Sequence, residues 1–323
     1  MRLLITGGAG FIGSHFVEYI LSKYPHYEVT NLDALTYAGS LENLKYVKNN
    51  PGHHFVHGRI EDGELVDKLV AGVDVIISFA SESHVDRSIV QPQIFIESNV
   101  VGTQVLLDAA RRHKIKLFYQ ISTDEVYGDS ELDSKEKSTE DSPLRPNSPY
   151  AASKAAADLL VLAYLQTYGL PVVVSRCCNN YGPKQHPEKF LPMVIINALK
   201  NKPIPIYGDG HYMRDWLHVR DHCCAIDLVL HRGKVGNIYN VAASNEWLNI
   251  DLAQKLLEML GKPKELIQFV KDRPAHDKRY AIDSTKIHQE FHWAPQVPWK
   301  RGLRELIKWY SEKPLGKEGG GGR

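Results

Sequence analysis

The sequence predicts an α/β protein in which a doubly wound parallel sheet is joined to a smaller, mixed α/β lobe. Two observations support this fold class. In the first half of the chain, short runs that are apolar on both faces alternate with helical patterns, as in parallel sheets covered by helices. A glycine-rich turn also joins the first apolar run to the first helical pattern.

The apolar runs and helical patterns define the expected elements. The expected strands of the sheet are Leu3–Thr6, Val29–Leu32, Phe55–His57, Val73–Phe79, Leu117–Ser122 and Val172–Cys177. The expected helices between them include Phe11–Lys23, Asn99–His113 and Pro149–Tyr168. The polar stretch Glu131–Arg145 is expected to be a surface loop.

Beyond about Asn179 the pattern loosens, which indicates a smaller lobe. Its expected strands are Ile204–Tyr207, Asn237–Val241 and Ile267–Val270, and its expected helices are Phe190–Lys200, Arg220–His231, Ile250–Leu260 and Gly302–Tyr310. We expect residues 1–178 to form the first domain, residues 179–315 the second lobe, and residues 316–323 a disordered tail. A crossing of the chain between the lobes is left open.

Composition narrows the class of protein. The formal net charge is only +1 over 323 residues, so no bulk attraction to nucleic acid or to a membrane surface is expected. No apolar run approaches the ~20 residues that a membrane span needs, and the chain opens on a strand rather than a secretory signal. The cysteines form two adjacent pairs, Cys177-Cys178 and Cys223-Cys224, which suit neither a metal site nor a disulfide. We expect buried or cleft-lining thiols, a cytoplasmic protein and no metal site.

The glycine-rich turn predicts a dinucleotide site on a Rossmann-type sheet. Gly7, Gly10 and Gly13 follow the first strand and open the first helix. They suit, in that order, a tight turn, a close approach of backbone to a pyrophosphate, and close packing of helix on sheet. The helix N-terminus then presents free N–H groups to phosphates. Asp33, after the second strand, suits the adenosine ribose hydroxyls and repels a 2′-phosphate, so NAD is expected rather than NADP.

Tyr150 and Lys154 form a Tyr-x-x-x-Lys pair at the start of a helix. Residues four apart lie on the same helix face. A nearby ammonium stabilises a phenolate and lowers the pKa of tyrosine, which creates a base able to take a proton from a sugar hydroxyl.

Thr123, Asp124 and Glu125 follow the fifth predicted strand. In open parallel sheets, ligands lie just beyond the carboxyl ends of the strands. Two adjacent carboxyls suit an elimination, in which an acid protonates the leaving hydroxyl and a base takes a proton alpha to a carbonyl. The triplet fits a simple turn equally well when it is taken alone.

Together these segments resemble the extended short-chain dehydrogenase/reductases and, within them, the family of dTDP-glucose 4,6-dehydratases. The likeness runs from Thr6 to about Tyr310. It is carried by Thr6–Gly13, Asp33–Gly39, Glu82–Ser88, Ser122–Gly128, Ser148–Lys154, Asn179–Pro183, Pro187–Lys189, Tyr207–Gly210, Arg214–Leu217 and Asp272–His276.

The resemblance implies a hydro-lyase with tightly bound, recycled NAD and a homodimeric assembly. Tyr150, assisted by Lys154, would deprotonate the sugar 4-hydroxyl as hydride leaves C4. Glu125 would then take the C5 proton, Asp124 would protonate the leaving C6 hydroxyl, and the hydride would return to C6. Thr123 would hydrogen-bond the oxygen at C4.

The resemblance also implies binding roles. The NAD site would comprise Gly7, Gly10, Phe11, Ile12, Gly13, Asp33, Ala34, Leu35, Thr36, Arg59, Ile60, Phe79, Ala80, Ser81, Ser83, Ser98, Tyr150, Lys154 and Asn180. The nucleotide-sugar site would comprise Ser83, Thr123, Asn179, Glu188, Lys189, Phe190, Pro205, Ile206, Tyr207, Arg214, Asn249, Arg273, His276 and Tyr280. Arg214 and Arg273 suit a clamp on a diphosphate.

Two departures from the family pattern bear on these expectations. Arg59 stands where the family has an aspartate facing adenine, so adenine would stack on the arginine, or Glu61 or Asp62 would compensate. Ala275 replaces a glycine of the Arg-Pro-Gly-His motif, so a negative φ is expected there.

Other functions fit parts of the same pattern. A UDP-sugar 4-epimerase shares the NAD site and the Tyr-Lys pair but has no need of two carboxyls, and a UDP-sugar 4,6-dehydratase shares all of them. A non-catalytic NAD-sensing protein on this fold usually lacks Tyr150 or Lys154. The nucleotide base stays open.

Overall fold

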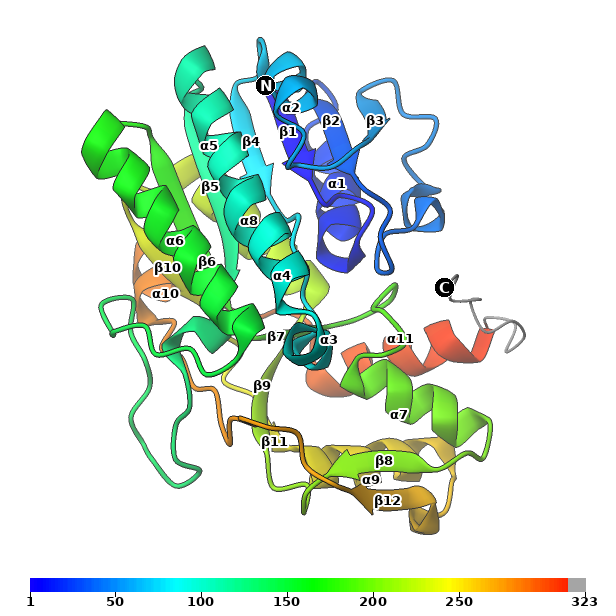
Figure 1. Cartoon of the computed structure of the whole chain (residues 1–323). Helices are drawn as coiled ribbons and strands as arrows, with labels where there is room; N and C mark the ends of the chain where they lie inside the picture. Colours follow the sequence, from blue (N-terminus) through cyan, green and yellow to red (C-terminus); the bar gives the residue numbers. More distant parts are fainter. Residues whose placement is uncertain (313–323) are drawn as a thin grey trace.

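The structure, a computed structural model, describes residues 1–312, which form a large helix-covered sheet and a smaller lobe beneath it in Figure 1. In this part of the chain the large sheet has seven strands in the order β10-β6-β5-β4-β1-β2-β3. All neighbouring strands are parallel. The strands are β1 (Arg2–Thr6), β2 (Glu28–Asp33), β3 (His53–His57), β4 (Val75–Ser78), β5 (Leu117–Thr123), β6 (Val172–Cys177) and β10 (Ile238–Val241). The predicted doubly wound sheet is confirmed.

Helices cover both faces of this sheet because its strands are apolar on both faces. Leu3 and Ile5 of β1 belong to the same apolar cluster as Phe16, whereas Leu4 between them belongs to the cluster that contains Leu106. The first cluster is covered by α1 (Phe11–Lys23) and α8 (Val219–Arg232), and the second by α2 (Gly63–Val70), α5 (Gly102–His113) and α6 (Pro149–Tyr168).

Short helices lie near the edge of the sheet where its strands end. They are η1 (Leu41–Leu44), α3 (Val85–Val90), α4 (Pro92–Phe95), the π-helical η2 (Ile96–Val101) and the 3-10 turn η3 (Asp124–Tyr127). The helix expected over 99–113 therefore begins as the π-helical segment η2 and becomes an α-helix only at Gly102.

The smaller lobe combines two small sheets with a helical layer. A three-stranded sheet has the order β11-β9-β7, and β12 pairs with β8 in parallel. Its apolar cluster includes Leu191, Ile195, Leu252, Leu256 and Leu303. The elements are β7 (Asn179–Tyr181), α7 (Phe190–Leu199), β8 (Ile204–Tyr207), β9 (Met213–His218), β11 (Glu246–Leu248), α9 (Asn249–Leu260), η4 (Lys264–Leu266), β12 (Ile267–Val270) and α11 (Trp299–Glu312).

The chain crosses between the lobes after residue 218. The strand expected at 237–241 in the smaller lobe is β10, which pairs with β6 at the edge of the large sheet. The prediction that this strand belongs to the smaller lobe was wrong, because the sequence of a four-residue apolar strand does not indicate which sheet the strand joins. Both α8, which contacts α1, and α10 (Thr285–Phe291), which contacts β10, also belong with the large sheet. The boundary at residue 178 stays a prediction.

Three local expectations can be compared with the structure. Cys177, Cys178 and Cys223 are buried and all four cysteines are free thiols, as predicted. The negative φ expected for Ala275 is wrong: its φ is +50°, because the turn at residues 274–275 uses the left-handed region even without glycine. The polar stretch over 131–145 forms turns and a single bridge, from Ser138 to Ile282.

The tail expected over 316–323 lies outside the described residues. None of the helices within residues 1–312 is long and apolar enough to cross a membrane. In the same range there is no group of three or more His, Cys, Asp or Glu side chains suited to a metal ion.

Candidate active site

The glycine turn after β1 is shaped for close backbone contact. Gly7 has φ +74°, and a Cβ on it would lie 2.6 Å from the amide nitrogen of Ala80. A Cβ on Gly13 would lie 2.3 Å from the carbonyl oxygen of Gly7. The α1 N-terminus, at the N-cap Gly10, carries no side-chain cap and no acidic residue in its first turn. These are the features that an approaching phosphate requires.

Asp33 lies at the carboxyl end of β2 and is 8 % exposed. Its carboxylate accepts hydrogen bonds from the backbone N–H of Ala9 (2.8 Å) and of Leu35 (2.8 Å). These contacts fix the carboxylate between the glycine turn and the segment after β2, and leave further lone pairs for ribose hydroxyls.

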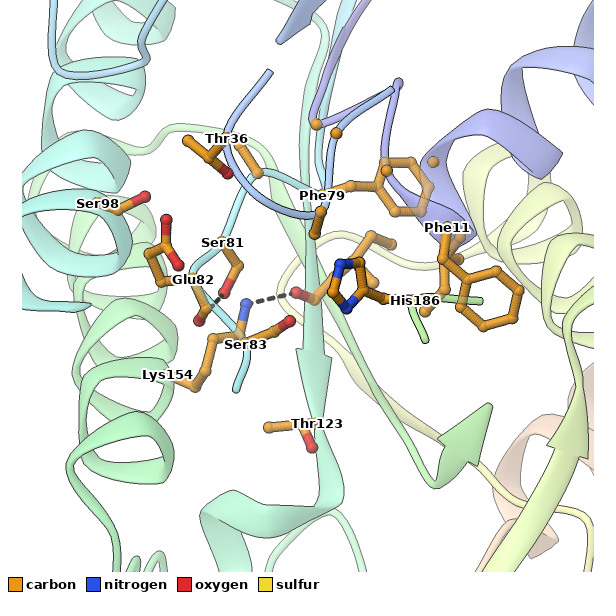
Figure 2. A pocket seen from close by; sticks show the side chains of 18 of the residues that line it. Phe11, Thr36, Phe79, Ser81, Glu82, Ser83, Ser98, Thr123, Lys154 and His186 are labelled. Carbon is orange, nitrogen blue, oxygen red and sulfur yellow. Dashed lines mark hydrogen bonds between the residues drawn. The ribbon is translucent and has the colours of Figure 1, made fainter. Parts of the chain in front are cut away.

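A pocket of about 290 Å³ opens along the carboxyl ends of these strands. In Figure 2, Ser98 and Glu82 lie on one side, Phe11 and His186 on the other, and Lys154 and Thr123 below. All residues expected to line NAD border this pocket except Leu35, which packs against the apolar cluster that contains Phe16. Of the residues expected to bind the nucleotide sugar, the pocket is bordered by Ser83, Thr123, Asn179 and Lys189. The binding roles themselves stay predictions.

The remaining residues expected to bind the sugar nucleotide do not border this pocket. They are Glu188, Phe190, Pro205, Ile206, Tyr207, Arg214, Asn249, Arg273, His276 and Tyr280. Conversely, the pocket is also lined by Tyr37, Gln185 and His186, which sequence reasoning did not single out, and by Cys177, one of the thiols expected to be buried or cleft-lining. Tyr37 falls within a segment that carries the family resemblance, which was the one available signal.

At the adenine end, Arg59 and Glu61 both border the pocket and form an ion pair of 3.6 Å. Asp62 instead caps α2, because its carboxylate accepts the N–H of Leu65 at 3.1 Å. Of the two acids proposed to compensate for Arg59, only Glu61 is thus at the pocket.

Tyr150 and Lys154 lie on the first turns of α6, where Ser148 caps the helix through the N–H of Ala151. Both side chains are buried, and the Lys154 ammonium donates to the carbonyl oxygen of Ile121 at 2.8 Å (Figure 2).

The expected lowering of the Tyr150 pKa is wrong for the chain by itself. Burial raises the pKa of Tyr150 well above its usual value, and the Glu125 carboxylate and the Cys177 thiol raise it further. Burial likewise lowers the pKa of Lys154, against the opposing charge of Asp158. The cause is desolvation, which disfavours the charged form of each group.

The carboxyl pair lies where β5 ends. The hydroxyl of Thr123 accepts the N–H of Glu125 (3.3 Å), which starts η3, and donates to Asp124 Oδ1 (3.2 Å). The other oxygen, Asp124 Oδ2, is buried without a hydrogen-bond partner among the described residues. Burial raises the pKa of Asp124 well above its usual value, and the neighbouring Glu125 raises it further. This environment favours a protonated Asp124.

Glu125 faces cationic and phenolic groups instead. Burial raises the pKa of Glu125, whereas Arg273, Lys189 and Arg214 oppose that shift. Its Oε2 accepts the hydroxyl of Tyr280 at 3.4 Å. The two carboxyls are thus distinguished by their surroundings, with Asp124 the better acid and Glu125 the better base.

Two residues expected to bind the nucleotide sugar, Arg214 and His276, already contact other groups of the chain. Arg214 donates to the carbonyl oxygens of Met213 (2.7 Å) and Asp277 (2.8 Å). Its guanidinium also lies 4.3 Å from the centroid of the Tyr280 ring. His276 Nδ1 donates to the Asp272 carboxylate at 2.8 Å, and the His276 ring stacks on Tyr212. Their roles as ligands stay predictions, but the Arg214 guanidinium already supports the loop that carries Tyr280.

Arg273 is less constrained. Its Nη1 donates to Asp86 at 3.4 Å, and its Nε is buried without a partner among the described residues. A buried donor left open beside the site suits an anionic ligand.

The family model of GDP-mannose 4,6 dehydratase matches residues 4–306. The chain belongs to this family. It is 50 % identical over 310 residues to the low-salt glycan biosynthesis protein Agl12 of Haloferax volcanii, covering 96 % of this chain and 98 % of that one. It is 48 % identical over 316 residues to a dTDP-glucose 4,6-dehydratase of Streptomyces niveus, covering 97 % of this chain and 93 % of that one.

Solved structures resemble this one closely. The crystal structure of DesIV, a dTDP-glucose 4,6-dehydratase from Streptomyces venezuelae with NAD and TYD bound, superposes with a TM-score of 0.94 at 49 % identity, covering 97 % of each chain. A Thermus thermophilus UDP-glucose 4-epimerase in complex with NAD has a TM-score of 0.88 at 32 % identity, covering 97 % of this chain and 99 % of that one. The fold is therefore shared by dehydratases and epimerases, and the site residues must decide between them.

Proposed function

We propose that this chain is a dTDP-glucose 4,6-dehydratase that holds NAD and converts dTDP-glucose to dTDP-4-keto-6-deoxyglucose and water. The observation that carries the proposal is the carboxyl pair of buried Asp124 and partly buried Glu125, which lines the same pocket as Tyr150 and Lys154. The dTDP-glucose 4,6-dehydratase of Streptomyces niveus, which is 48 % identical over 316 residues, supports the choice of substrate.

The residues present fit NAD. The glycine turn leaves room that a Cβ would fill, the α1 N-terminus is uncapped, and Asp33 is fixed beside it. Bound NAD would supply the hydride acceptor for C4 and the hydride donor for C6.

The chain itself would move the protons. Tyr150 takes the proton of the 4-hydroxyl, and Lys154 lies four residues further on along the same helix, α6. Glu125 takes the C5 proton, which the neighbouring 4-ketone acidifies, and would return a proton to C5 when hydride is added at C6. Asp124, protonated because it is buried beside Glu125, gives its proton to the C6 hydroxyl as that group leaves as water. Thr123 holds Asp124 and starts the turn that carries Glu125.

An epimerase would use the same oxidation step but would need neither proton transfer at C5 nor protonation at C6. A buried, unpaired Asp124 oxygen would have no use in that reaction and would cost free energy. This contrast favours dehydration over epimerisation.

Incubation of the protein with dTDP-glucose tests the proposal. We expect a product that has lost one water by mass and gains ultraviolet absorbance in alkali, with UDP-glucose as the matched comparison. Turnover of UDP-glucose without turnover of dTDP-glucose would overturn the substrate, and a 4-epimer as product would overturn the reaction.

We also propose a homodimer. The supporting observation is a row of exposed apolar side chains on α3, η2 and α6, namely Val90, Ile96, Val101, Leu159 and Tyr168. Both α3 and η2 contact α6, and exposed apolar side chains on neighbouring helices suit a protein interface. Light scattering is expected to give twice the chain mass, and Leu159→Arg is expected to give a monomer. A wild-type monomer would contradict the proposal.

We further propose a cytoplasmic setting, supported by the free thiols. Thiol titration of unfolded protein purified without reductant is expected to find all four cysteines reduced. A disulfide would contradict it.

A further inference from the structure

A contact between the two lobes lies beside the cofactor pocket. Tyr37, in the segment after β2, lines this pocket. The Arg87 guanidinium of α3 lies 3.9 Å from the centroid of the Tyr37 ring, and the His186 ring meets the same tyrosine edge-on at 5.4 Å. The Tyr37 side chain is thus held between one group of the large-sheet lobe and one of the smaller lobe.

Arg87 also reaches the smaller lobe directly. Its Nε and Nη2 donate to the two carboxylate oxygens of Glu188, at 3.2 and 2.7 Å. Glu188 lies next to Lys189, the N-cap of α7, whose ammonium donates to the carbonyl oxygen of Ser83 at 2.8 Å. In Figure 1, α3 lies where the large sheet meets the lobe that contains α7.

The geometry of Arg87 uses both properties of a guanidinium. Its planar face stacks on Tyr37 while its edge forms a two-bond fork with Glu188, which a lysine could not do. The pKa of Glu188 is affected by its partial burial, which opposes ionisation, but Arg87 lowers it overall. An exposed ion pair alone stabilises little, because two side chains must be ordered for it. Here one ordered side chain makes two contacts.

We infer that Arg87 is a cofactor-retaining residue, which ties the Tyr37 segment to Glu188 across the pocket so that bound NAD leaves only when this contact opens. The inference rests on the proposed function, in which NAD is regenerated in each cycle and gains from staying bound. Neither Arg87 nor Glu188 borders the pocket, so Arg87 acts through Tyr37 rather than by touching NAD.

The test is the rate at which NAD leaves the loaded protein, measured by rapid mixing with an excess of a competing nucleotide. Arg87→Ala is expected to release NAD about tenfold faster, equivalent to ~1.4 kcal/mol. Arg87→Lys and Glu188→Gln are expected to give intermediate rates, because each removes the fork but leaves a cation beside Tyr37. Adding Glu188→Gln to Arg87→Ala should give no further increase.

The matched control is Arg112→Ala. Arg112 on α5 makes a similar exposed contact with Asp67, at 3.0 and 2.9 Å, and neither residue borders the cofactor pocket. Its release rate and melting temperature should equal those of the wild type.

A wild-type chain that binds no NAD would overturn the proposed function and the retaining role with it. Binding by the wild type with an unchanged release rate in Arg87→Ala would overturn only the retaining role. An equal acceleration in Arg112→Ala would overturn it too, because the effect would then be general loosening.

Discussion

Replacing Asp124 with asparagine should separate the oxidation of the sugar from the loss of water. Asp124 is 2 % exposed, its Oδ2 has no partner among the described residues, and burial beside Glu125 raises its pKa. The Asp124→Asn side chain would keep its size and an oxygen for the Thr123 hydroxyl, but it would have no acidic proton to give to the leaving C6 hydroxyl.

The size of the effect follows from the role. Loss of a positioned general acid slows the step it serves by about 10²–10⁴-fold. At ~1.36 kcal/mol per tenfold, that is ~3–5 kcal/mol of barrier. Oxidation at C4 should continue, because Tyr150 and Lys154 act from a different element, α6.

The assay mixes NAD-loaded variant with dTDP-glucose in a single turnover, following NADH by its near-ultraviolet absorbance and water loss by mass. We expect NADH to form and persist while water loss slows by the factor above. The control is Asp133→Asn, an exposed aspartate in the loop over 131–145, which should behave as wild type. Water loss at the wild-type rate would refute the assignment, as would loss of NADH formation in a folded Asp124→Asn.

Three further predictions concern stability and cofactor binding. Burial raises the pKa of Asp124 in the folded state, so the free energy of unfolding should fall as pH rises from the unfolded-state pKa through the folded-state pKa. Asp124→Asn should therefore raise the melting temperature at pH ~8 but not at pH ~4. Equal changes in melting temperature at both pH values would contradict this reasoning. A Cβ at Gly13 would lie 2.3 Å from the Gly7 carbonyl oxygen, so Gly13→Ala should destabilise the folded chain by ~1–3 kcal/mol. The same variant should weaken NAD binding in a fluorescence titration. Unchanged NAD affinity would argue against the proposed cofactor site. Arg176→Met removes the ion-pair partner, 2.9 Å away, of the fully buried Asp158. The free energy of unfolding, measured with urea, should fall by ~3–5 kcal/mol because Asp158 is left as an unpaired buried charge. A decrease of less than ~1 kcal/mol would contradict this explanation.

The large sheet could be predicted because the sequence of each strand by itself indicates that the strand is buried. The run 172–177 opens with three valines and is buried on both faces, as expected of a parallel strand between two helical layers. The placement of β10 could not be predicted, because β6, the strand with which it pairs, lies more than sixty residues earlier. The four residues of β10 would also suit either the large sheet or a sheet of the smaller lobe. The three-stranded sheet was missed since β7 and β11 have only three residues each.

The reacting groups were predictable because, in open parallel sheets, functional residues lie at the carboxyl ends of the strands. Strand ends and the helix after them bring Asp124, Glu125, Tyr150 and Lys154 to one pocket, although their surroundings could not be read from spacing. The raised pKa of Tyr150 depends on burial by residues far apart in sequence.

Contacts between the two lobes also could not be predicted from the sequence. The pairing of Arg87 with Glu188 joins residues 101 positions apart, and no periodicity predicts it. The internal bonding of Arg214 is likewise a tertiary feature, because the carbonyl oxygen of Asp277 that it contacts lies 63 positions away.

The central claim is that one bound NAD carries a hydride from C4 to C6 of the sugar while Glu125 and Asp124 remove water between the two transfers. The most direct measurement uses dTDP-glucose with deuterium at C4, in ordinary water, and locates the label in the product. The account predicts that the deuterium is found on C6 of the product. Deuterium retained at C4, or lost to solvent without appearing at C6, would contradict it.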